Sequence, residues 1–93
     1  MTTSHPIARI TVVSAPACHF CHDAEAALVE LAAQHPISVE TIQADSDAGR
    51  ALISQHRPAM MPLVLLDAQF FSAGRLPRRK LTKTLASREA VSV

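Results

Sequence analysis

A chain of 93 residues is long enough for one small domain, and 48% apolar residues with only two glycines exclude a disordered or fibrous chain. No apolar run is long enough to span a membrane, so we expect no membrane partner. The formal net charge is +1 and the chain has no Tyr or Trp, which leaves little to stack on bases and argues against a nucleic-acid partner.

The charges are unevenly spread along the chain. Residues 1–67 hold seven of the eight acidic side chains, whereas residues 68–93 hold six of the nine basic ones. The basic region is either a solvated helix face, which the pattern favours, or an edge that attracts an acidic partner or an anionic thiol.

The first two predicted elements flank a pair of cysteines. Residues 7–13 are β-branched and apolar, which predicts a central strand that ends before Pro16. From Phe20, apolar residues recur at helical spacing until residues 34–36 end the helix. This pattern assigns three acidic side chains to the outer face of the helix: Asp23, Glu25 and Glu30.

The middle of the chain repeats this alternation of strand and helix. Residues 37–43 predict a second strand, and Asp45 or Ser46 caps a short helix that ends near residues 57–58. Residues 63–67 predict a buried strand with Pro62 at its first position, the position where a sheet tolerates proline.

The C-terminal part predicts a hairpin and a last helix. Residues 68–69 are a short turn into a strand at residues 70–72, and Pro77 fits the first position of a helix with Leu81 and Leu85 on its inner side. We expect one domain with a core at about residues 7–86 and a frayed tail from Ser87 onward.

The resulting order, β-α-β-α-β-β-α, predicts an α/β domain with a mixed four-stranded sheet and helices on both faces. Two β-α-β crossovers imply parallel pairing, and the final hairpin adds antiparallel strands. The cysteine pair then lies at the carboxyl end of the first strand, where open α/β sheets place reactive sites.

Cys18 and Cys21, the only cysteines, are too close in sequence to staple a fold. Residues 1–6 lack the basic start and apolar run of an export signal, so we expect a cytoplasmic protein, where such a pair is more often catalytic or metal-binding than structural. A thiol in the first helical turn lies at the positive end of the helix dipole, which favours the reactive thiolate. We therefore assign Cys18 as the nucleophile and Cys21 as the resolving cysteine, with Cys18 the more exposed sulfur.

These residues resemble the thioredoxin fold in its minimal, glutaredoxin-like form, and in particular the small glutaredoxin-like proteins of bacteria. The Cys-x-x-Cys after the first strand, Met61-Pro62 before the third and the hairpin-Gly-helix ending carry the resemblance, which covers about residues 7–85. It implies a cis proline at Pro62 packed against the disulfide, and a Met61 backbone that pairs with an extended substrate. It also implies a thiol–disulfide oxidoreductase, monomeric and without a bound cofactor, that reduces protein or small-molecule disulfides and draws electrons from a reductase or a low-molecular-weight thiol.

The departures from that family concern glutathione and thioredoxin features. Glutaredoxins that use glutathione usually have a Lys where this chain has Ala15, and Thr-Val-Pro where it has Met60-Met61-Pro62. Residues 72–75 stand where those proteins have two glycines followed by an acidic residue. Each departure removes a glutathione contact. The Trp before the motif and the Gly-Pro inside it, usual in thioredoxins, are also missing. The resemblance therefore points to the redox class and not to a particular reductant.

The residues around the cysteines allow two interpretations each. His19 either lowers the pKa of Cys18 or is an exposed imidazole without influence. Phe20 is either a rim contact for substrate or an anchor for the helix, which its spacing favours. His22 is expected at the surface, and a role for Asp23 as a proton carrier is the weaker interpretation of that residue.

Three other functions stay open on the sequence. A redox-silent interaction module keeps the fold without the chemistry. A metal site could use the cysteines with His19 or His22, although a single Cys-x-x-Cys is weak evidence for zinc. Residues 18–22 also match c-type haem attachment, with Met60 or Met61 as a distal ligand, but flanking strands and the lack of an export signal argue against it.

Overall fold

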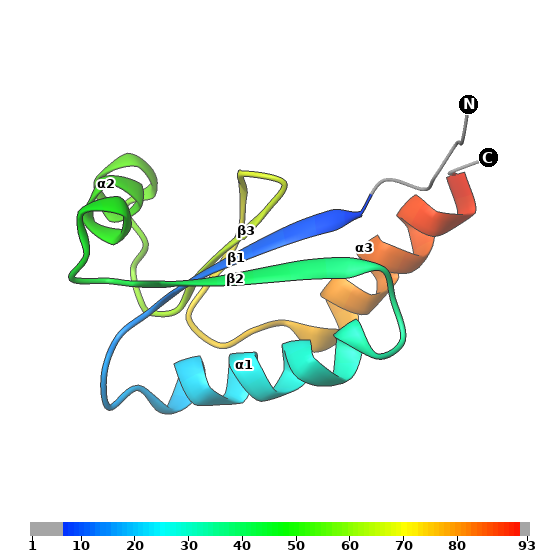
Figure 1. Ribbon diagram of the computed structural model, residues 1–93, viewed down its shortest axis with the longest axis horizontal. Coiled ribbons are helices and arrows are strands. Elements are labelled where there is room, and N and C mark those ends of the chain that lie inside the picture. Colours follow the sequence, from blue (N-terminus) through cyan, green and yellow to red (C-terminus); the bar gives the residue numbers. More distant parts are fainter. Residues whose placement is uncertain (1–6, 92–93) are drawn as a thin grey trace.

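The computed structural model describes residues 7–91 and the side chains of residues 7–88. The elements in chain order are β1 (Ala8–Ser14), α1 (His19–Ala32), β2 (Ile37–Gln43), α2 (Asp47–His56), β3 (Leu63–Leu66), β4 (Gln69–Ala73) and α3 (Arg78–Val91), as Figure 1 shows. This order confirms the predicted one. The segment at residues 1–6, on which the expectation about an export signal was based, lies outside the described residues.

The sheet has four strands in the order β2-β1-β3-β4. β1 and β2 are parallel, β3 is antiparallel to β1, and β4 is antiparallel to β3. The mixed sheet is confirmed, but the prediction of two parallel crossovers is wrong for the second one. The reason is that Leu63, the first residue of β3, pairs with Val13 at the carboxyl end of β1. The chain therefore leaves β2 and enters β3 at the same end of the sheet, with α2 between them.

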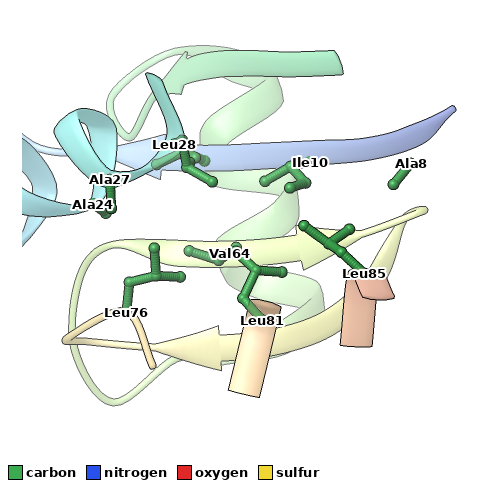
Figure 2. Close-up of a cluster of buried hydrophobic side chains, with 10 residues drawn as sticks. Ala8, Ile10, Ala24, Ala27, Leu28, Val64, Leu76, Leu81 and Leu85 are labelled. Atoms are coloured by element: carbon green, nitrogen blue, oxygen red, sulfur yellow. The ribbon is translucent and has the colours of Figure 1, made fainter. Parts of the chain in front are cut away.

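Two apolar clusters cover the two faces of the sheet. On one face, α1 and α3 pack against β1 and β3, and Figure 2 shows the side chains of this larger cluster. Leu81 and Leu85 of α3 are buried there, as predicted. On the other face, α2 contributes Leu52 and Ile53 to a smaller cluster around Val13. Helices thus cover both faces, and the first strand runs between the two clusters.

The starts of α2 and α3 are set by local hydrogen bonds. Ser46 caps α2, because its Oγ accepts the Gly49 N–H at 3.0 Å. Gly49 is required by space, since a Cβ there would lie 2.0 Å from the Gln43 carbonyl oxygen of β2. The carbonyl of Pro77 accepts the Leu81 N–H at 3.0 Å, so Pro77 precedes the first helical residue instead of being that residue.

The last helix continues to Val91, beyond Ser87, where the sequence placed the start of a frayed tail. An ion pair holds the helix to the sheet as far as Arg88, because the Arg88 guanidinium contacts the carboxylate of Asp67 in the β3–β4 turn. Residues 92–93 lie outside the described part of the chain.

The β3–β4 turn lies one residue earlier than predicted. Its two central residues are Asp67 and Ala68, with φ of 51° and 69°, and Leu66 pairs with Gln69 across it. Two consecutive positive φ values define the hairpin turn that Asn-Gly usually forms. Asp67 is held there because its carboxylate accepts the Arg9 N–H at 2.9 Å and contacts Arg88, so two distant elements fix the turn.

The substitution Ala68→Gly is expected to raise the free energy of unfolding by about 0.5–1 kcal/mol, because glycine adopts a positive φ without the steric cost that a Cβ carries. Urea unfolding followed by circular dichroism measures it. The matched control is Ala26→Gly on the exposed side of α1, which should lower the free energy by about 1 kcal/mol. A loss of stability in both variants contradicts the assigned turn.

The pKa of Asp67 lies below its usual value, chiefly because its carboxylate accepts the Arg9 backbone N–H and also contacts Arg88, while partial burial opposes the shift. Since the folded pKa is lowered, this stabilisation is present at neutral pH and is lost as the pH falls through the folded pKa. Asp67→Asn should therefore unfold at lower urea than the wild type at neutral pH, and the difference should narrow in acid. A gap that stays constant with pH would contradict this linkage.

Candidate functional site

Cys18 is the N-cap of α1, and its sulfur performs the capping. The Cys18 Sγ accepts the Cys21 N–H at 3.1 Å, and the Cys18 carbonyl accepts the His22 N–H at 3.1 Å. This sulfur occupies the place that a Ser or Asp oxygen takes in most helix caps. A negative charge on Cys18 would therefore meet a backbone donor and the positive end of the helix dipole.

The two cysteines form a disulfide, with their Cα atoms 5.2 Å apart. Cys21 is 0% exposed, whereas Cys18 is partly exposed, which confirms the predicted difference in exposure. An incoming sulfur can therefore reach Cys18 and cannot reach Cys21 without movement of the chain. The roles of nucleophile and resolving cysteine stay predictions, and they require this difference in exposure.

A short turn delivers Cys18 from the sheet to the helix. β1 ends at Ser14, and Ala17, the residue before the cap, has a φ of 55°. A non-glycine residue in this left-handed region costs on the order of 1 kcal/mol, which the surrounding structure must offset. The turn reverses the chain so that α1 begins next to the carboxyl end of β1.

A hydrogen bond between Ser14 and Glu25 ties α1 to the end of β1. Ser14 is 4% exposed, and its Oγ donates to Glu25 Oε2 at 2.7 Å. The prediction that Glu25 lies on the outer face of the helix is wrong. Glu25 follows Cys21 by four residues, so the two share one face of α1, and this spacing was the available signal. The pair is the part of the site that sequence reasoning missed.

Met61 and Pro62 lie at the same end of the sheet as the disulfide. The bond between them is cis, as the resemblance implied, and Pro62 is fully buried. The next residue, Leu63, pairs with Val13, which lies five residues before Cys18. The Met61 side chain packs against the smaller apolar cluster around Val13, on the face of the sheet that α2 covers (the α2-side cluster). The Met60 side chain is 54% exposed.

The side chains beside the cysteines are open to solvent. His19 and His22 are exposed, the latter as predicted. Phe20 is 37% exposed and belongs to neither apolar cluster, so the packing of the described residues gives no support to its interpretation as a helix anchor. On α1 the cluster begins at Ala24, and the first turn carries Phe20 outside it.

Asp23 pairs with α3. Its carboxylate accepts a hydrogen bond from Arg78 at 3.0 Å, and both side chains are about half exposed. Asp23 and Cys21 are two residues apart, a spacing that does not place them on one face of a helix. The geometry gives no support to Asp23 as a proton carrier for Cys21.

Neither a metal-binding cluster nor a membrane-spanning helix is present in the part of the chain that the structure describes. No three His, Cys, Asp or Glu side chains among residues 7–88 come together as a group that could hold a metal ion. None of the helices within residues 7–91 is long and apolar enough to cross a membrane.

The sequence was also compared with known proteins. No family model matches the chain, and no curated protein matches it. The assignment of a function therefore depends on the geometry of the site.

The Ser14–Glu25 hydrogen bond predicts that Ser14→Ala lowers the free energy of unfolding by about 1 kcal/mol, because a carboxylate loses its donor. Chemical unfolding measures the change. Ser72→Ala is the matched control, since Ser72 is also buried in a strand but its Oγ has no hydrogen-bond partner among the described residues. That control should change stability by less than about 0.5 kcal/mol. Equal losses in the two variants would contradict the assigned bond.

Proposed function

We propose that this protein is a thiol–disulfide oxidoreductase with a thioredoxin-like fold in its minimal, glutaredoxin-like form. The observation that carries the proposal is the Cys18–Cys21 disulfide at the start of α1, in which partly exposed Cys18 caps the helix through its sulfur and Cys21 is buried. The element order, the strand order and the cis Met61–Pro62 bond are compatible with that fold.

In the proposed reaction, the reduced protein reduces a substrate disulfide in two exchanges. The Cys18 thiolate attacks one substrate sulfur, so a Cys18–substrate bond forms, the substrate disulfide breaks and the leaving sulfur takes a proton. The Cys21 thiol then loses its proton and its sulfur attacks Cys18, which releases the second substrate thiol and forms the Cys18–Cys21 disulfide. Two electrons have passed to the substrate.

The helix cap accounts for the order of these steps. Because the Cys21 N–H and the helix dipole stabilise charge on Cys18, the Cys18 thiol is the better thiolate and makes the first attack. A low-molecular-weight thiol or a reductase returns the two electrons, and a reducing compartment such as the cytoplasm supplies either one.

The proposed substrate contact is the loop that leads into β3 and contains Met61 and Pro62. The backbone of Met61 would pair with an extended segment that carries the substrate disulfide, since its side chain is engaged in the α2-side cluster. His19 and Phe20 provide exposed contacts on the helix side of the disulfide.

We expect the Cys18 thiol to have a pKa below the value of about 8.5 for a free cysteine. Alkylation of reduced Cys21→Ser by iodoacetamide across a pH series gives this pKa, because Cys18 is then the only thiol. A midpoint at or above that of free cysteine contradicts the proposed catalysis. The variant Cys18→Ser, which leaves the buried Cys21, should react far more slowly.

The two cysteine variants should also separate the two exchanges. Cys18→Ser should abolish reduction of a peptide disulfide, and Cys21→Ser should accumulate a mixed disulfide visible by mass spectrometry. NADPH consumption, with a thioredoxin reductase in one arm and glutathione with its reductase in the other, identifies the reductant. Full dithiol activity in both cysteine variants would overturn the assigned roles.

A further inference from the structure

A basic surface lies beside the disulfide helix and has no part in the exchanges described above. It consists of Arg75, Arg78, Arg79 and Lys80, at the start of α3 and in the loop before it. Residues 75–80 and Asp23 of α1 line one hollow in the surface. Four cationic side chains therefore share this hollow with a single carboxylate.

Most of that positive charge is uncompensated within the described part of the chain. Arg78 is paired with Asp23, and Lys80 lies over the Phe71 ring, 5.1 Å from its centroid, which leaves its charge in place. Arg75 and Arg79 are exposed and form no ion pair with any described residue. The surface therefore presents at least two guanidinium groups to a partner.

The surface contacts the helix whose first turn holds the disulfide. Asp23 follows Cys18 by five residues of helix, a rise of about 7.5 Å. That length is similar to the distance of about 8 Å over which physiological salt screens charge. Arg78 is bonded to Asp23 at 3.0 Å, so the basic surface begins at the second turn of this helix, about one screening length along its axis from Cys18.

The same surface meets the loop that precedes β3. Gly74, next to Arg75, lies against the side chain of Met60, because a Cβ on that glycine would be 3.4 Å from the Met60 Cβ. Met60 is 54% exposed and directly precedes the Met61–Pro62 step. An extended segment bound along this loop would pass an apolar side chain and then the arginines.

We propose that the basic surface selects polypeptide disulfides flanked by acidic residues. This inference rests on the proposed function and specifies its substrate class. The charges lie on exposed side chains spread over residues 75–80, an arrangement that fits several carboxylates of an extended chain better than one enclosed small anion. The reaction is the exchange described above, with Cys18 bonding to the substrate sulfur, and the arginines contribute attraction and orientation only.

The test uses the pre-reduced protein in single-turnover exchange with three peptide disulfides that differ only in flanking residues: acidic, uncharged or basic. Acidic flanks raise the pKa of the leaving thiol, so a small uncharged thiol should reduce that peptide most slowly. The rate of the protein with each peptide is divided by the rate of the small thiol with the same peptide. This normalised rate should be about tenfold higher for the acidic peptide than for the basic one. High salt should reduce that preference.

Matched variants locate the preference. Arg75→Gln with Arg79→Gln should remove most of the advantage of the acidic peptide. Arg9→Gln with Arg57→Gln removes the same charge from exposed positions in β1 and at the end of α2, and should leave the preference unchanged. Loss of preference in both double variants would show an effect of net charge alone and would overturn the proposal.

The remaining outcomes separate this proposal from the one it rests on. Equal normalised rates with all three peptides overturn the acidic preference while the oxidoreductase activity stands. No exchange with any peptide overturns the proposed function itself. If the arginine variant slows glutathione disulfide but not the acidic peptide, the surface serves a small anion, and the proposal for a polypeptide segment is wrong.

Discussion

The capping of α1 by a cysteine sulfur is the interaction on which the rest of the site depends. Because Cys18 Sγ accepts the Cys21 N–H, the sulfur has one fixed place, at the first turn of the helix and at the end of β1. That place sets which cysteine is exposed and which is buried. It also makes the local field of the helix act on Cys18, the sulfur that the proposed reaction uses first.

The fold serves this cap by fixing the helix relative to the sheet. Ala24, Ala27 and Leu28 pack into the larger apolar cluster, so the long axis of α1 is held against β1 and β3 (Figure 2). The Ser14–Glu25 hydrogen bond ties the middle of the same helix to the end of β1. These contacts hold the helix that presents partly exposed Cys18.

The elements of the fold were readable from the sequence because most of them carry local signals. The strand at residues 37–43 was placed where the structure has it, and the third strand was predicted to begin within one residue of its start at Leu63. One boundary that moved is set by distant partners. The β3–β4 turn moved to Asp67 because Arg9 and Arg88 hold its carboxylate, and neither partner is near in sequence. The direction of β3 depends on where the chain re-enters the sheet, which no local pattern encodes.

The sequence by itself determined that two thiols stand at the start of a helix after a buried strand, because the apolar spacing and the prolines are local features of the chain. Only the tertiary structure decided how those thiols are surrounded. It buried Cys21, exposed Phe20 against expectation, turned Glu25 inward to Ser14 and brought Arg78 to Asp23. Each of these facts depends on packing between elements far apart in the chain, and such packing leaves no periodic signal in the residues that take part.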